Sequence, residues 1–134
     1  MNAKPFLDTN ILIYAFTTGD PRSATAEALL EEGGTVSVQV LNEFVNVSRR
    51  KLRRPWHEIE DALGVLRTLL VAPLPLTLEL HETAIGLARD HKISFYDGLI
   101  VAAASRAGCR VLYSEDLQDR RELMGVAIRN PFAK

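Results

Sequence analysis

The sequence has little of several features that mark special classes of protein. Among its 134 residues there is a single cysteine, Cys109, which rules out an internal disulfide and fits a reducing compartment. Positive charge is not in excess, because 16 lysines and arginines against 17 aspartates and glutamates give a formal net charge of −1. The chain as a whole therefore does not attract nucleic acid, and any such binding must come from local basic patches or metal ions.

Long hydrophobic runs are missing too. No apolar segment reaches the ~20 residues that a membrane-spanning helix requires. Residues 1–16 lack the basic start and the small-residue cleavage site of a signal peptide. We therefore expect a soluble, cytoplasmic protein. With 47% hydrophobic and 25% charged residues, the composition is that of a folded globular chain, and its length favours one domain over 1–134.

Short apolar segments alternate with amphipathic ones along the chain. The predicted strands are 4–8, 35–38, 110–114 and 126–132, and the predicted helices are 9–16, 22–32, 39–54, 56–70, 77–92 and 95–108. Thr9 or Asn10 is available to cap the first helix, and Asp20 with Pro21 suits the start of the second. The alternation predicts an α/β fold with a parallel sheet.

Four carboxylates stand where strands end or helices begin. Asp8 ends the first strand, Asp116 follows the strand "RVLYS", and Asp97 opens the apolar helix "FYDGLIVAAASRAG". Glu43 lies early in the helix 39–54, among apolar neighbours. Because ligands of open α/β sheets gather beyond the carboxyl ends of the strands, we expect these acids to converge on one pocket.

Such a pocket needs a cation. Two carboxylates ~4 Å apart repel by about 4 kcal/mol at an effective dielectric constant near 20, so several together do not stay ionised without compensation. Mg²⁺ or Mn²⁺ prefers carboxylate and water oxygens. A metal ion held in this way can activate water and stabilise an in-line phosphoryl displacement.

Each acid taken singly also has a purely structural explanation. Ser94 with Asp97 resembles a capping box, worth about 1 kcal/mol, and Asp8 could cap the helix that follows it. Asp116 could be a turn residue, and Glu43 could simply reach solvent. The joint placement of the four acids favours the metal site.

Several segments together resemble a known family. They are "FLDTNILIYAF", "VQVLNEFVNVSRRK", "ISFYDGLIVAAASRAGCRVLYSEDL" and the terminal "NPF", and they cover nearly the whole chain in order. The sequence resembles the PIN-domain ribonucleases and, more narrowly, the VapC-type toxins of prokaryotic toxin–antitoxin pairs. The motifs "LDTN" and "YDGLIVAAA…SEDL" are the specific ones, whereas the Glu in "LNEF" is specific only in their company.

The resemblance implies a three-layer α/β/α fold with a central parallel sheet, and Mg²⁺- or Mn²⁺-dependent cleavage of RNA. It also implies a homodimer silenced by a cognate antitoxin protein. Carried over by position, the metal-binding and catalytic acids would be Asp8, Glu43, Asp97 and Asp116. The small polar residues beside them, Thr9, Asn10 and Ser114, would orient these acids. Glu115 or Asp119 could add a further carboxylate.

The basic run "RRKLRR" has two interpretations of equal weight. Its members are Arg49, Arg50, Lys51, Arg53 and Arg54. They could form a solvated helix end favoured by the helix dipole, or they could hold RNA phosphates beside an otherwise acidic pocket. For the whole chain, the alternative to an enzyme is a catalytically inactive PIN-like module that binds RNA or protein.

Overall fold

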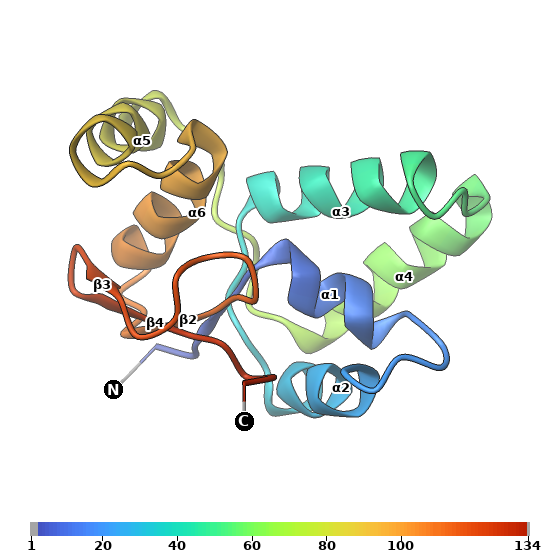
Figure 1. The fold of residues 1–134 in the computed structure, drawn as a ribbon. Coiled ribbons are helices and arrows are strands. Elements are labelled where there is room, and N and C mark those ends of the chain that lie inside the picture. Colours follow the sequence, from blue (N-terminus) through green and yellow to red (C-terminus); the bar gives the residue numbers. More distant parts are fainter. Residues whose placement is uncertain (1–2, 134) are drawn as a thin grey trace.

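The computed structural model describes residues 3–133, drawn in Figure 1. The helices are α1 Thr9–Ala15, α2 Ser23–Glu32, α3 Val38–Arg50, α4 Trp56–Leu69, α5 Leu78–His91 and α6 Phe95–Arg106. The strands are β1 Phe6–Leu7, β2 Val111–Tyr113, β3 Glu122–Leu123 and β4 Val126–Arg129. None of the helices in this part of the chain is long and apolar enough to span a membrane.

The strands form one sheet in the order β1-β2-β4-β3. β1 pairs in parallel with β2, and β2 in parallel with β4, so that Leu112 lies opposite both Phe6 and Ile128. These three side chains are fully buried. The predicted α/β fold with a parallel sheet is confirmed, and its first and last strands in the sequence lie on either side of β2.

The sheet also has an antiparallel edge that the sequence did not predict. β3 turns back onto β4 through Met124 and Gly125, whose φ angles are 50° and 77°. Two consecutive positive φ angles in a two-residue loop are typical of a type I′ hairpin turn. The usual sequence signal for this turn is Asn-Gly or Asp-Gly. Here methionine occupies the position of Asn or Asp, so the sequence did not indicate the turn.

The strand predicted at 35–38 is wrong. Only isolated bridges remain there, from Thr35 to Phe6 and from Ser37 to Leu74. Ser37 is instead the N-cap of α3, where its side-chain oxygen accepts a hydrogen bond from the Val40 N–H. A serine at this position satisfies a free N–H group of the first helical turn, so the chain enters the helix after only a brief contact with the sheet edge.

Several helix ends also differ from prediction by one residue or more, and the ends of α3 and α2 have a clear physical reason. α3 ends at Arg50, before the predicted 54, and Arg53 has a left-handed backbone with φ of 54°. α2 begins at Ser23 with Arg22 as its N-cap residue, whereas Asp20 accepts hydrogen bonds from the Arg22 backbone and guanidinium. The ion pair with Arg22 thus replaces the predicted cap.

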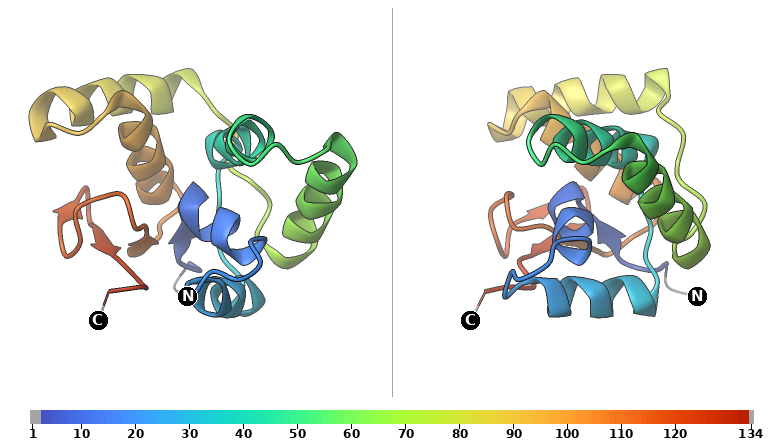
Figure 2. Two further views of the ribbon diagram at one scale, coloured as in Figure 1. Left: turned by 45° about the vertical axis from the view of Figure 1, so that its right-hand side comes forward. Right: turned by 90° about the vertical axis from the view of Figure 1, so that its right-hand side faces the viewer.

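The helices lie on two sides of the strands (Figures 1 and 2). α6 packs against β2 and β4 and carries α5 on its other side, whereas α1 packs against α2 and α3, and α3 against α4. Residues 98–104 of α6 are all buried. This apolar helix therefore fixes where its first turn, which contains Asp97, stands relative to the sheet.

Candidate active site

Asp8 lies at the end of β1, where the chain turns into α1. It is the N-cap of α1, so the prediction that Thr9 or Asn10 caps this helix is wrong. Its carboxylate accepts hydrogen bonds from the Thr9 N–H at 2.7 Å and from the Ser114 hydroxyl at 2.7 Å. Only 4% of Asp8 is exposed. The hydrogen bond from Ser114 joins the end of β1 to the segment that follows β2.

Glu43 reaches the same place from α3. The Thr9 hydroxyl donates to Glu43 Oε1 at 3.1 Å, and Gln39 Nε2 donates to Glu43 Oε2 at 3.0 Å. The carboxylate is half-buried, so the interpretation that it simply reaches solvent is wrong. Gln39 was missed in the sequence, although its position one helical turn before Glu43 is a spacing at which side chains on one helix meet.

Asp116 is held by Asn10. Asn10 Nδ2 donates to Asp116 Oδ2 at 3.1 Å, and Asn10 Oδ1 accepts from the Glu115 N–H at 3.2 Å. The Ser114 hydroxyl oxygen accepts from the Leu117 N–H at 3.3 Å. Asn10 and Ser114 therefore fix the turn after β2 against the start of α1.

Asp97 lies in the first turn of α6. Ser94 is the N-cap of this helix, and its hydroxyl oxygen accepts from the Asp97 N–H at 3.0 Å. The serine half of the predicted capping box is therefore present. The Asp97 side chain is half-buried. A helix cap and a position beside the other acids are compatible, and the structure has both.

Electrostatics shows that the four acids lie near one another. The pKa of Asp8 is raised from 3.8 to about 7, mainly by burial; its two hydrogen bonds lower it, and the charges of Glu43 and Asp97 contribute to the rise. Burial also raises the pKa of Glu43 and of Asp97. Asp116 adds to both of these shifts through its charge. The four carboxylates predicted from the sequence are brought together around one place.

The donors fit a hard cation. The atoms available are carboxylate, hydroxyl and carboxamide oxygens, which suit Mg²⁺ or Mn²⁺. Within residues 3–133, no three His, Cys, Asp or Glu side chains are close enough to enclose a metal ion by themselves. Mg²⁺ usually keeps several of its waters and uses only one or two carboxylates. Any ion bound here would therefore need water molecules among its ligands.

A second cluster of side chains, around Arg22 and Glu115, was not predicted from the sequence. Arg22 donates to both carboxylate oxygens of Glu115 at 2.9 Å, and it pairs with Asp20 at 2.8 Å. Its guanidinium lies 3.8 Å from the centre of the Tyr14 ring, and the Tyr14 hydroxyl donates to Glu115. Burial and Glu115 raise the pKa of Tyr14 to about 12. Arg22 and Glu115 are 93 positions apart, so no local pattern connects them.

Because Glu115 directly precedes Asp116, Arg22 is expected to position Asp116. We expect Arg22→Ala to lower kcat for the reaction at this site about 10-fold, with little change in KM, a typical effect for a residue that supports metal ligands. The kcat of Arg22→Lys should lie between those of wild type and Arg22→Ala. Arg89→Ala is the control, since its pair with Asp90 is exposed and worth little. A kcat unchanged in Arg22→Ala would show that the cluster only stabilises the fold.

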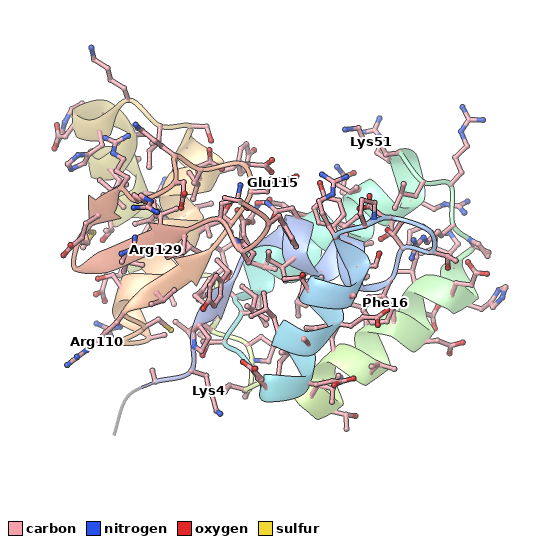
Figure 3. All side chains as sticks on the ribbon, turned by 60° about the horizontal axis from the view of Figure 1, so that its bottom comes forward. Lys4, Phe16, Lys51, Arg110, Glu115 and Arg129 are labelled. Atoms are coloured by element: carbon pink, nitrogen blue, oxygen red, sulfur yellow. The ribbon has the colours of Figure 1, made fainter. Side chains whose placement is uncertain are left out.

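Of the two extra carboxylates considered, Glu115 is the partner of Arg22, and Asp119 accepts a hydrogen bond from the Asn130 N–H at 2.8 Å. Both therefore have structural partners. Figure 3 shows Glu115 towards the middle of the molecule and Lys51 at the far end of α3.

The basic run lies at the C-terminal end of α3. Arg49 and Arg50 form its last turn, and Lys51 is the C-cap. The Arg49 guanidinium lies 4.9 Å from the centre of the Trp56 ring, and it donates to the Arg54 carbonyl at 3.1 Å. At 1.5 Å per residue, Arg49 is about 9 Å along the helix axis from Glu43. The run is thus separate from the acids: it begins on the last turn of α3, the helix that carries Glu43, and continues into the connection to α4.

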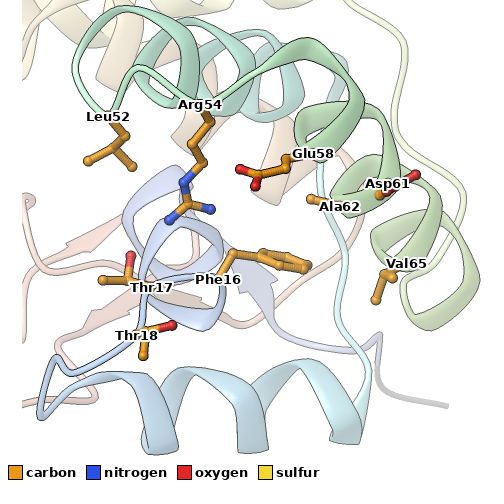
Figure 4. A pocket seen from close by; sticks show the side chains of 9 residues that line it. All are labelled: Phe16, Thr17, Thr18, Leu52, Arg54, Glu58, Asp61, Ala62 and Val65. Carbon is orange, nitrogen blue, oxygen red and sulfur yellow. The ribbon is translucent and has the colours of Figure 1, made fainter.

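One cavity lies away from the acids. It has a volume of ≈ 680 Å³ and lies between the end of α1, the α3–α4 connection and α4 (Figure 4). Its lining residues are Phe16, Thr17, Thr18, Leu52, Arg54, Glu58, Asp61, Ala62 and Val65. None of the four clustered carboxylates lines it. The chemistry of the donors, not the size of a cavity, therefore locates the candidate site.

Three solved structures share this fold. A VapC20 toxin of Mycobacterium tuberculosis, described as cleaving the sarcin-ricin loop, is 23% identical with a TM-score of 0.69, over 83% of this chain and 90% of that chain. A toxin–antitoxin complex from Klebsiella pneumoniae is 22% identical with a TM-score of 0.71, over 96% and 98%. VapBC2 of Rickettsia felis, bound to promoter DNA, is 18% identical with a TM-score of 0.66, over 93% and 96%.

Comparison of the sequence with models of protein families identifies one family. No curated protein matches the chain. The family model of the PIN domain matches residues 6–121, a span that begins at β1, contains all four acids and ends just before β3. The chain belongs to the PIN-domain family.

Proposed function

We propose that this protein is a metal-dependent endoribonuclease that acts as the toxin of a VapBC-type toxin–antitoxin pair. The observation that carries the proposal is the convergence of Asp8, Glu43, Asp97 and Asp116, with the pKa of buried Asp8 raised to about 7. A buried cluster of acids is costly to ionise unless a cation neutralises it. The fold shared with an RNA-cleaving toxin and with toxin–antitoxin complexes supports the proposal.

The four acids would hold Mg²⁺ or Mn²⁺. The bound ion would lower the pKa of a water molecule and neutralise charge on the phosphate during in-line displacement. Thr9, Asn10 and Ser114 keep the acids in place, because each donates a hydrogen bond to one carboxylate. Gln39 restrains the other oxygen of Glu43. The site would thus be rigid before the ion and substrate arrive.

The substrate would be RNA that approaches along α3. The acids repel phosphate, whereas the basic run at 49–54 attracts it, and its first member, Arg49, lies about 9 Å along α3 from Glu43. We therefore assign Arg49, Arg50, Lys51, Arg53 and Arg54 to the RNA backbone. The partner would be a cognate antitoxin, by analogy with the toxin–antitoxin complexes that share the fold. The active form would be a cytoplasmic homodimer, as the family resemblance implies.

The test is cleavage of end-labelled structured RNA by the purified protein in Mg²⁺ or Mn²⁺. Wild-type protein should cut internal bonds, EDTA should abolish cutting, and a renewed excess of metal should restore it. Asp97→Asn and Asp116→Asn should lose activity yet keep the circular dichroism spectrum. Cutting that survives EDTA or both substitutions would overturn the proposal. RNA binding without any cutting would favour the non-catalytic module.

A further inference from the structure

A smaller cavity borders the acid cluster and has no role in the chemistry described above. It has a volume of ≈ 470 Å³ and lies between α3 and the start of α6. Its lining residues are Gln39, Asn42, Glu43, Asn46 and Tyr96. Because Glu43 belongs to both the cavity and the acid cluster, a group bound in the cavity would lie directly beside the candidate reaction site.

The lining is rich in carboxamides. Gln39, Asn42 and Asn46 recur at three- and four-residue steps, so they share one face of α3 with Glu43. Gln39 is 8% exposed and is engaged with Glu43. Asn42 and Asn46 are exposed, and neither side chain has a hydrogen-bond partner within the described part of the chain. Two carboxamides are therefore available, each with a donor and an acceptor.

The other wall is aromatic. Tyr96 is 61% exposed, which is high for a large ring. It lies in the first turn of α6, next to Asp97, and its ring contacts Phe95 edge to face at 5.5 Å between centroids. The helix cap at Ser94 and the buried run of α6 fix the backbone that carries it. Tyr96 thus presents a positioned ring beside the acids.

We propose that this cavity binds one nucleobase of the RNA, that of a nucleotide adjoining the phosphate at the acid cluster. The proposal rests on the endoribonuclease function above. Stacking of a base on an aromatic ring contributes to the binding of single-stranded nucleic acid whatever the base. Carboxamides read the edges of unstacked bases through paired donors and acceptors.

The lining also argues against a phosphate group as the ligand of this cavity. No lysine or arginine lines the cavity, and the one charged side chain there is Glu43. A phosphate group would therefore meet negative charge and no cation. An uncharged, flat, hydrogen-bonding group such as a base fits these walls, whereas the phosphates remain with the metal site and the basic run.

Binding can be tested without catalysis. A short single-stranded RNA with one 2-aminopurine is titrated with the protein in EDTA, where fluorescence quenching reports stacking. We expect quenching by wild-type protein, at least fivefold weaker binding with loss of quenching in Tyr96→Leu, and recovery in Tyr96→Phe. Leu78→Ala, an exposed apolar residue on α5, is the control. Absent quenching in wild type, or quenching equal in Tyr96→Leu, overturns the proposal.

Specificity is tested by mapping cut sites in Mg²⁺ or Mn²⁺. Asn42→Ala and Asn46→Ala should raise KM and weaken the base preference at one position next to the cut, with kcat largely retained. An unchanged preference in both variants and in Tyr96→Leu overturns the base site, while the endoribonuclease function stands. If wild type cuts no RNA but quenches 2-aminopurine through Tyr96, the endoribonuclease function fails and base binding survives.

Discussion

Replacing Asp8 with asparagine is expected to abolish RNA cleavage and, in the absence of metal, to make the protein more stable. The loss of activity should exceed about 100-fold, since even residues that only support metal ligands cost 10- to 100-fold. The gain in stability comes from removing a charge that burial disfavours. Asparagine has nearly the same shape, and it can still accept a hydrogen bond from the Thr9 N–H and make one with Ser114.

The direction of the pH dependence follows from the pKa of Asp8. It is about 7 in the folded protein and 3.8 in the reference state, so between these values the folded state holds a proton that the unfolded state has lost. Wild-type stability should therefore fall as pH rises from about 4 to 7 and stay lower above that. At pH 8 the Asp8→Asn variant should be more stable than wild type by at least about 2 kcal/mol, since each unit by which the pKa of Asp8 is raised corresponds to ~1.4 kcal/mol.

Urea unfolding in EDTA at pH 5 and at pH 8 checks this result. The variant should exceed wild type in stability by clearly less at pH 5 than at pH 8, because Asp8 is still protonated in the folded protein at pH 5. Asp90→Asn is the matched control, because that carboxylate is on the surface. Saturating Mg²⁺ should stabilise wild type and not Asp8→Asn, since only a state that binds the ion gains from it. A variant less stable than wild type at pH 8 would contradict this account of Asp8.

Gly98→Ala is expected to destabilise the fold by about 1–3 kcal/mol and to reduce activity as well. A Cβ at Gly98 would lie 2.8 Å from the Ala84 carbonyl oxygen and 3.3 Å from its Cα, both backbone atoms of α5. No side-chain rotation relieves this contact, so α5 and α6 must move apart. Because Gly98 follows Asp97 in the first turn of α6, the same movement displaces Asp97.

Gly64→Ala is the control for Gly98→Ala. Gly64 lies in α4, and a Cβ there would meet no atom within 4 Å. Alanine is favoured over glycine in a helix by about 1 kcal/mol, so this substitution should stabilise the protein. Denaturant midpoints measure both effects. If Gly98→Ala were as stabilising as Gly64→Ala, the close crossing of α5 and α6 would be contradicted.

The acids could be predicted from the sequence because local signals place them. Asp8 and Asp116 each follow a short apolar strand, and Asp97 opens an apolar helix, so the strand and helix boundaries fix their positions. Parallel strands then bring their carboxyl ends to one edge of the sheet. The alternation of strands and helices predicted the α/β fold with a parallel sheet, whereas the PIN-like form of that fold came from the family resemblance, with which the family model agrees.

The parts that could not be predicted depend on tertiary contacts. The Arg22–Glu115 pair joins residues far apart in the chain, and the cavity at Tyr96 needs α3 and α6 side by side. The strand predicted at 35–38 had the right β-branched residues, but the cap supplied by Ser37 starts a helix there instead. Local propensity is a weak guide where a cap or a distant partner decides the outcome.

The claim that the four acids hold a divalent cation is tested most directly by anomalous diffraction from crystals soaked in Mn²⁺. The account predicts an anomalous peak bound by an oxygen of Asp8 and by at least one of Glu43, Asp97 and Asp116, with waters in the remaining positions. The same soak of Asp8→Asn crystals should weaken or remove the peak. No peak at saturating Mn²⁺ in wild type, or a peak away from these carboxylates, would contradict it.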